Sequence, residues 1–351
     1  MTLLLPLSRV KSHHHAAVGG KCFALGEMAR HGIPVPDTIC VSAQAYRDYV
    51  AATGLRERIM LELGRKNLSD MRWEELWDAS LRIRNMFLRT PIPAGLAARL
   101  ADALEERFRG EAVVVRSSAP GEDSEAVSFA GLHDSFINVK GIEPLLEHIR
   151  LVWASLWSDA ALLYRRDLGL EVASSTMAVV VQELVRGDRS GVVFSRSPSD
   201  AAQAVVESVY GLNQGLVDGT VEPDRWIIDR ASGHVLSHVA PSRDHRLVPG
   251  AEGVRLEPLP KGLSRQPPLT TEQVEEVFEW SQQLEALFGR PQDVEWTWGD
   301  GGLTVLQSRP ITTLEGRDPY DERRWYLSLR RSFENLQKLR DRIERELIPG
   351  M

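Results

Sequence analysis

The sequence predicts an α+β fold of two lobes, each built on a mixed or antiparallel sheet. Three observations predict it. Residues 43–110 and 143–167 carry apolar side chains at helical spacing. Residues 177–239 and 292–310 hold short β-branched runs joined by tight polar or glycine-rich turns, which is typical of hairpins. The length of 351 residues suits two domains or one large two-lobed domain.

The composition is that of an ordinary globular protein, with 43% hydrophobic and 26% charged residues. The net charge of −7 argues against a dedicated nucleic-acid-binding protein, although a small anion needs only a local cluster of cations. The only cysteines, Cys22 and Cys40, cannot form a disulfide framework, and no apolar run is long enough to span a membrane. We therefore expect a soluble, cytoplasmic protein without nucleic-acid or membrane partners.

The stretch Ala112–Val139 organises the rest of the chain. It begins as an apolar strand, delivers Arg116 to the strand end, and continues as a loop of small and polar residues before a second strand. An arginine fork beside flexible turns can hold a polyphosphate, because small residues let backbone N–H groups approach oxygen closely. The alternative is a surface hairpin with a solvated arginine, and the local pattern alone does not separate the two.

A second anion-site candidate is Gly19-Gly20-Lys21. These residues precede apolar positions at helical spacing, so they place a cation and free N–H donors at the positive end of a helix. The alternative is a plain helix start with a solvated lysine. The neighbouring run His13–His15 favours a loop over a metal site, because three adjacent histidines cannot all face one ion.

Helices dominate the first lobe. Trp73 and Trp77 share an apolar stripe and are expected in the core, and the pattern from Glu143 to Asp167 predicts one long core helix. Residues 241–269 are rich in proline, glycine and arginine, which predicts an exposed excursion. Thr270 then caps a helix that ends at Gly289.

A hairpin over residues 292–310 carries the second group of polar residues. Glu295 lies on one strand, and Gln307 and Arg309 lie on one face of the other. A carboxylate, an amide oxygen and an arginine that meet across two strands suit a metal–polyphosphate site, because Mg²⁺ takes oxygen ligands and keeps substrate phosphates in its shell. The alternative is a half-buried strand with a cross-strand ion pair.

Six motifs occur in order along the chain, namely Gly19-Gly20-Lys21, Arg116–Ala119, Ser128–Gly131, Val181-Gln182-Glu183, Asp293–Trp296 and Gln307–Thr312. Together they resemble the N-terminal ATP-binding domain of the phosphoenolpyruvate synthase and pyruvate phosphate dikinase family, which has an ATP-grasp-like fold with a nucleotide cleft between its lobes. The resemblance covers about residues 10–313.

The resemblance implies a role for each matching position, with ATP and Mg²⁺ as the cofactors. Lys21 and Arg116 would contact the phosphates, and Arg309 would grip the phosphate being transferred. Glu295 and Gln307 would hold Mg²⁺. The turn formed by Ser128, Phe129, Ala130 and Gly131, with Ser135, would cover the phosphates, and a hinge would bind adenine through the backbone of Gln182, Glu183, Leu184 and Val185.

The resemblance also sets the expected domain organisation. Residues 1–315 would form the nucleotide-binding domain, with one lobe over about 1–180 and the other over about 181–315. Residues 316–351 are highly charged and predict an amphipathic helix that could dock on a partner.

Members of this family pass a phosphoryl group to a histidine in a Thr/Ser/Gly-rich motif, and none of the nine histidines here lies in such a motif. We therefore expect the ATP-binding subunit of a split dikinase, which transfers the β-phosphate to a histidine on a partner subunit and releases AMP and phosphate. A phenol-type acceptor, as in phenylphosphate synthase, is the leading candidate. The alternatives are a pyruvate-water dikinase, a rifampicin-type phosphotransferase, an ATP-grasp ligase that releases ADP, and a nucleotide-binding module without turnover.

Overall fold

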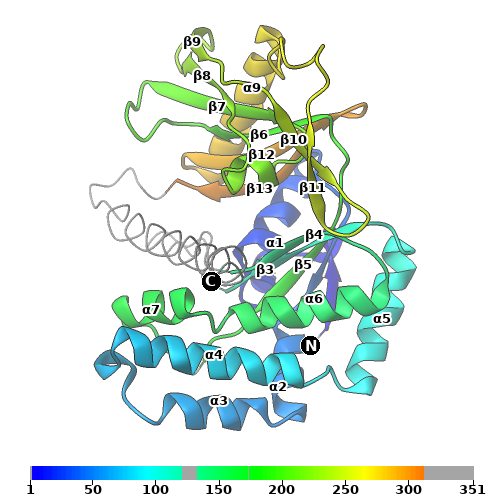
Figure 1. The fold of residues 1–351 in the computed structure, drawn as a ribbon, viewed down its shortest axis with the longest axis vertical. Coiled ribbons are helices and arrows are strands. Elements are labelled where there is room, and N and C mark those ends of the chain that lie inside the picture. The colour runs from blue at the N-terminus through cyan, green and yellow to red at the C-terminus, as the bar shows by residue number, and fades with distance from the viewer. Residues whose placement is uncertain (1, 121–132, 173, 312–351) are drawn as a thin grey trace, which may run out of the picture. The chain divides into compact units, whose positions relative to one another are not determined.

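The computed structural model describes residues 2–120, 133–172 and 174–311 (Figure 1). By its internal contacts the chain divides into two compact units, Met1–Ile311 and Thr312–Met351. The predicted C-terminal helix, residues 316–351, lies outside the described residues. The whole Ser128–Gly131 turn lies outside them as well, within the gap at residues 121–132. No described helix combines the length and the apolar character needed to cross a membrane.

The first lobe is built on a five-stranded sheet in which every neighbouring pair is antiparallel. Its middle strand is buried on both faces. Val179 and Val181 join a core with the helical layer, whereas Ala178 and Val180 join a second core with α1 and the other lobe. In spatial order the strands are β1 (Leu4–Pro6), β2 (Thr38–Val41), β5 (Ala178–Glu183), β3 (Val113–Ser118) and β4 (Ser135–Val139).

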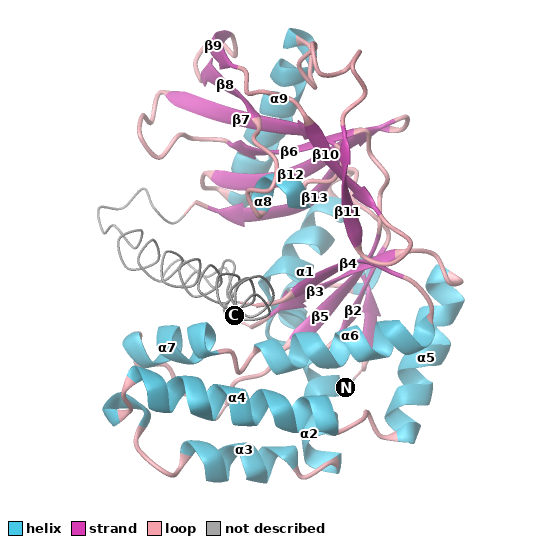
Figure 2. Ribbon diagram, in the orientation of Figure 1, coloured by secondary structure: helices cyan, strands magenta, loops and turns pink. Residues whose placement is uncertain are grey.

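Helices cover this sheet, as Figure 2 shows. The helix α1 (His15–Arg30) lies against β3, β5 and the strand β13 (Gly302–Pro310) of the other lobe, on the face that bears the second core. The helical layer on the opposite face consists of α2 (Ala43–Ala52), α3 (Leu55–Leu63), α4 (Trp73–Arg89), α5 (Ala94–Phe108), α6 (Ile142–Ser155) and α7 (Asp159–Asp167).

Two predictions about this layer are wrong. The single helix expected over Glu143–Asp167 is two helices, because the chain breaks at residues 156–158 and Ser158 caps α7 by accepting the N–H of Ala161 at 3.1 Å. Trp73 and Trp77 are not core residues, since they are 48% and 42% exposed. The helix α4 instead buries the adjacent stripe that includes Leu76, Ile83 and Phe87.

The second lobe is built on a six-stranded antiparallel sheet. The helix α9 (Thr271–Phe288) packs on it and begins at the predicted cap, where Thr270 accepts the N–H of Gln273. In spatial order the strands are β13 (Gly302–Pro310), β12 (Gln292–Gly299), β6 (Arg189–Phe194), β7 (Gln203–Tyr210), β8 (Asp224–Asp229) and β9 (Val235–Val239).

Shorter elements complete this lobe. The helix α8 (Gln214–Val217) follows β7. The segment 241–269 is less irregular than predicted, because β10 (His245–Pro249) and β11 (Val254–Pro258) pair as a hairpin and Leu247 is buried. The fold is thus α+β with two large antiparallel sheets, which confirms the fold class that the sequence predicted.

Candidate functional site

The site is formed where β3 of the first sheet meets the β12–β13 hairpin of the second. Alternation along β3 sends Val113 and Val115 into the helical core, so Arg116 extends from the opposite face. There one guanidinium nitrogen, Nη1, donates to Glu295 Oε2 at 3.2 Å and to Gln307 Oε1 at 3.1 Å. Three residues predicted as site residues are therefore in direct contact.

The hairpin register explains why four polar side chains share one face. Glu295 pairs directly with Gln307, and Asp293 pairs directly with Arg309. A register shift follows Glu295, because Trp296 pairs with Val305 and leaves Leu306 as an extra residue. Such a bulge reverses the alternation beyond it, so β13 keeps Val305 in the core and turns Gln307 to the Glu295 face.

Glu295 is the electrostatic centre of the site. Its side chain is 14% exposed. Burial alone would raise the pKa of its carboxyl. The net effect is the opposite, and the pKa lies below its ordinary value of 4.5, because burial is outweighed by the charges of Arg116 and Arg309, the hydrogen bond from Arg116 and the charge of Lys21. The carboxyl is therefore ionised near neutral pH.

Arg309 is held in place by Asp293. Its Nε and Nη2 both reach Asp293 Oδ2, at 2.8 Å and 2.6 Å. This planar contact fixes the guanidinium on the same strand face as Gln307. No role was predicted for Asp293. Its spacing of two residues from Glu295 is the signal that could have identified it, because this spacing places both carboxylates on one side of a strand.

Lys21 is positioned by a kink in α1. Gly19 has a φ of 75°, so the helix is interrupted there and resumes with Gly20 and Lys21. Ser118 fastens the kink to the end of β3, because its Oγ accepts the N–H of Cys22 at 3.1 Å and donates to the carbonyl of Val18 at 2.7 Å. Lys21 Nζ consequently lies 3.5 Å from Ser117 Oγ.

The predicted hinge connects the two sheets. The buried Gln182 donates from Nε2 to the carbonyl of Leu306 at 3.3 Å, so its side chain is directed at the bulge in β13. The N–H groups of Glu183 and Leu184 donate to the carbonyls of Asp37 and Ala112. Both donors are thus engaged within the fold, while Val185, next along the chain, is half-buried.

Among the remaining predicted site residues, the structure describes Ser135. Ser135 is exposed at the start of β4 and pairs directly with Arg116 in the sheet register. Ser128, Ala130 and Gly131 lie outside the described residues. His13 and His14 lie in a 3₁₀ turn, and His15 begins α1.

The donor set at Glu295 and Gln307 fits a hard cation that shares its ligands with a substrate. Among the described residues, no three His, Cys, Asp or Glu side chains gather closely enough to hold a metal ion by themselves. Mg²⁺ does not need such a cage, because it combines one or two protein oxygens with substrate phosphates and water. The ionised Glu295 and the amide oxygen of Gln307 are oxygens of that kind.

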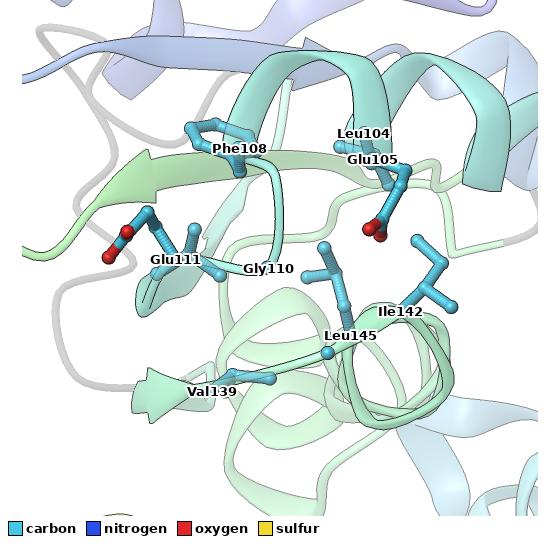
Figure 3. Close-up of a pocket in the computed structure, with 10 residues that line it drawn as sticks. Leu104, Glu105, Phe108, Gly110, Glu111, Val139, Ile142 and Leu145 are labelled. Atoms are coloured by element: carbon cyan, nitrogen blue, oxygen red, sulfur yellow. The ribbon is translucent and has the colours of Figure 1, made fainter.

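A separate pocket between α5, β3, β4 and α6 does not belong to this site (Figure 3). Its lining is mainly apolar, with Leu104, Phe108 and Leu145 among the residues, and the carboxylates of Glu105 and Glu111 lie beside it. The interior offers about 10 Å³, which is room for about one water molecule.

Comparison with known proteins places these observations in a family. The model for the pyruvate phosphate dikinase AMP/ATP-binding domain matches residues 15–324. A rifampicin phosphotransferase of Streptomyces sp is 36% identical over 317 residues, which cover 89% of this chain and 36% of the relative. A phosphoenolpyruvate synthase of Aeropyrum pernix is 34% identical over 348 residues, with 88% and 42% covered.

A probable phosphoenolpyruvate synthase of Methanocaldococcus jannaschii is 32% identical over 305 residues, with 85% of this chain and 26% of the relative covered. The chain therefore spans between about a quarter and two fifths of the length of these relatives. Because the family model covers most of the chain, including α1, β3 and the β12–β13 hairpin, the chain belongs to the pyruvate phosphate dikinase AMP/ATP-binding domain family.

Proposed function

We propose that this chain binds ATP with magnesium between β3 and the β12–β13 hairpin and presents the phosphates to a histidine on a partner subunit. The observation that carries the proposal is that Arg116 of the first sheet lies within hydrogen-bonding distance of both Glu295 and Gln307 of the second. Family membership supports ATP as the nucleotide, and this convergence of side chains supports a phosphate and metal site here.

The cationic side chains would do most of the catalytic work. Phosphoryl transfer develops charge on the transferred group and needs little covalent help, so rate enhancement comes from positioning and charge stabilisation. Lys21 and Arg116 would bind the phosphates from the first lobe. Arg309, fixed by Asp293, would hold the group in transfer from the second.

Magnesium would be held by Glu295 and Gln307, and when bound it would neutralise phosphate charge. The depressed pKa of Glu295 supports this assignment, because the carboxyl is already ionised when a cation arrives. Adenine would contact the hinge from Gln182 to Val185, with the backbone past Leu184 as the part that could bind the base. Ser135 and the turn with Ser128, Ala130 and Gly131 would cover the phosphates.

The proposed overall reaction converts ATP, the partner's imidazole and water to phosphohistidine, AMP and phosphate. The phosphohistidine then passes its phosphoryl group to a small acceptor. We propose a phenol-type acceptor, with rifampicin and pyruvate as the alternatives that the names of the relatives supply. The charged segment 316–351 is our candidate for the docking of the partner, and the cytoplasm is the proposed location.

The test is labelling of the partner's histidine from [β-³²P]ATP. The chain is mixed with a purified histidine-domain polypeptide of a family member, and acid-labile, base-stable label is counted while nucleotides are separated by chromatography. Glu295→Gln and Arg309→Ala are each expected to lower the labelling rate by at least about 100-fold, as the removal of a group that stabilises transition-state charge does.

Glu75→Gln is the matched control, because Glu75 pairs with Lys66 at 2.7 Å on the outer helical layer. It is expected to label at the rate of the unmodified protein. Release of ADP in place of AMP would identify an ATP-grasp ligase, and ATP binding without any turnover would identify a binding module. Either result would overturn the proposed transfer.

A further inference from the structure

One side-chain nitrogen holds both oxygens that are assigned to the metal. Arg116 Nη1 lies 3.2 Å from Glu295 Oε2 and 3.1 Å from Gln307 Oε1. The Arg116 and Glu295 side chains are 13% and 14% exposed, so water does little to weaken their interaction. In the absence of nucleotide, a cation of the protein therefore already occupies the position between the two oxygens.

Arg116 Nη1 and a metal ion cannot both lie between Glu295 Oε2 and Gln307 Oε1. Mg²⁺ binds oxygen at about 2.1 Å, and an ion placed between these two oxygens needs the lone pairs that accept the Arg116 hydrogen bonds. An ion on the same side as Nη1 would overlap that nitrogen, and an ion on the far side would lie a few ångströms from a like charge. Binding of the ion to both oxygens therefore requires Arg116 to leave.

The charge balance of the nucleotide-free site points in the same direction. Lys21, Arg116 and Arg309 all act on the Glu295 carboxylate. Three cationic side chains of the described part of the chain therefore converge on this one carboxylate. Such a cluster attracts a polyphosphate and disfavours a bare divalent cation.

We propose that the Arg116 guanidinium is a stand-in for the metal and occupies the metal position in the nucleotide-free protein. There Arg116 excludes a free divalent cation, and it leaves this position only when nucleotide phosphates bind the guanidinium. The proposal rests on the proposed function. Phosphate oxygens give Arg116 a new charged partner, so its departure costs little once ATP is present. Metal and nucleotide should therefore bind with positive coupling, each raising the affinity of the site for the other.

A purely structural ion pair would behave differently. Removal of Arg116 from such a pair would leave Glu295 without its partner and lower the stability of the fold. It would not create a tighter site for metal. Metal affinity measured without nucleotide therefore separates the two roles, and it does not depend on any enzymatic rate.

The experiment measures Mn²⁺ binding by the electron paramagnetic resonance of the free ion, with Mn²⁺ in place of Mg²⁺ because both prefer oxygen ligands. Arg116→Met keeps most of the side-chain volume and removes the charge. Without nucleotide, this variant is expected to bind Mn²⁺ at least about tenfold more tightly than the unmodified protein, a difference of ~1.4 kcal/mol. Arg116→Gln serves as a second variant if the methionine substitution lowers the melting temperature strongly.

Two controls locate the effect. Arg225→Met removes the arginine that pairs with Glu207 at 2.9 Å on β8, and it is expected to leave Mn²⁺ affinity unchanged. The double variant Arg116→Met/Glu295→Gln is expected to lose the gain. In the unmodified protein a non-hydrolysable ATP analogue should raise Mn²⁺ affinity strongly, whereas in Arg116→Met this dependence on the analogue should be smaller.

Equal Mn²⁺ affinity of the Arg116 variants and the unmodified protein, with the analogue still raising both equally, would overturn the stand-in role and leave the proposed function intact. Failure of every variant to bind Mn²⁺ with or without the analogue would remove the metal site itself, and with it the proposed function.

Discussion

Gln182 links the predicted hinge to the proposed metal site. The resemblance assigns its backbone to adenine, while the residue is 1% exposed and its side-chain amide donates to the carbonyl of Leu306. Leu306 is the extra residue of the bulge that turns Gln307 toward Glu295. The side chain of Gln182 therefore supports the proposed metal ligand, and only its backbone remains for the hinge.

Replacement of Gln182 by leucine should weaken metal binding more than it changes recognition of the nucleotide base. The leucine fills a similar volume but leaves the Leu306 carbonyl without its donor, which costs about 1–3 kcal/mol of folding stability. With the bulge loosened, the magnesium dependence of nucleotide affinity should weaken several-fold, and the preference for ATP over GTP should stay the same. Calorimetric titrations with both nucleotides, at high and low magnesium, measure each quantity.

The matched control is Gln44→Leu, which removes an amide that bonds Asp48 and Arg47 on α2. This variant should change neither the magnesium dependence of nucleotide affinity nor the preference for ATP over GTP. A loss of ATP preference in Gln182→Leu, with the magnesium dependence intact, would instead assign the Gln182 amide to the base.

At the scale of elements, the sequence predicted strands and helices well where the apolar residues follow a single periodicity, either that of a strand or that of a helix. It predicted β5, the cap of α9 and the hairpin of β12 and β13. It also put Gln307 and Arg309 on one face, which is correct because both follow the bulge. The bulge itself is invisible in the pattern, since an extra residue between Val305 and Gln307 leaves no compositional mark.

The errors in the helical layer have a different cause. Apolar periodicity continues through residues 156–158, so nothing in it marks the break between α6 and α7. The break is fixed by tertiary contacts, because Arg165 and Ser80 donate to the free carbonyls of Leu156 and Trp157. On α4 two apolar stripes lie side by side, and only packing decides that Leu76 is buried and Trp73 is exposed.

The kink of α1 gives the clearest prediction at this scale. A Cβ at Gly19 would lie 2.1 Å from the Ser118 carbonyl oxygen, and φ is positive there. Gly19→Ala should therefore push α1 away from β3 and lower the free energy of unfolding by about 1–3 kcal/mol. Because Lys21 moves with the helix, ATP affinity should fall as well. Urea unfolding and calorimetric titration report the two effects.

Gly95→Ala serves as the control for Gly19→Ala. Gly95 lies in α5, and a Cβ there meets no atom within 4 Å. Alanine should stabilise that helix by up to about 1 kcal/mol, because it lowers the backbone entropy lost on folding. If the two substitutions changed stability equally, the close contact between Gly19 and Ser118 would not be the cause.

For the whole molecule, the candidate site depends on residues that periodicity cannot connect. Arg116 lies 179 residues from Glu295 and 191 from Gln307 in the sequence. Local patterns suggested three separate anion or metal sites and left each with a plain alternative. Only the ordered motifs of the family joined them, and the antiparallel packing of two sheets supplies the physical reason that they meet.

Two carboxylates with depressed pKa values make the stability of the whole fold sensitive to acid. Glu295 lies between the two sheets. Glu285 is partly buried, and burial would raise its pKa, but hydrogen bonds from Arg230 and Ser195 and the charges of Arg230 and Arg196 lower it. Arg230 lies 2.9 Å from Glu285, which ties α9 to its sheet.

The sign of the effect follows from proton linkage. Each carboxyl has a lower pKa in the folded protein than its ordinary value of 4.5, so the unfolded chain binds more protons in that range. The stability that these groups contribute is fully present above pH 4.5 and is lost as pH falls through the folded pKa values. Urea unfolding between pH 7 and pH 3.5 should therefore show a steep decline below about pH 4.5.

Glu285→Gln separates this contribution from general acid unfolding. The variant should be less stable than the unmodified protein at pH 7, because Arg230 loses its charged partner. It should also lose less stability on acidification, since one of the protonating groups is gone, so the two curves should converge at low pH. Parallel curves across the whole range would mean that Glu285 has the same pKa folded and unfolded, and that the contact with Arg230 contributes nothing to acid sensitivity.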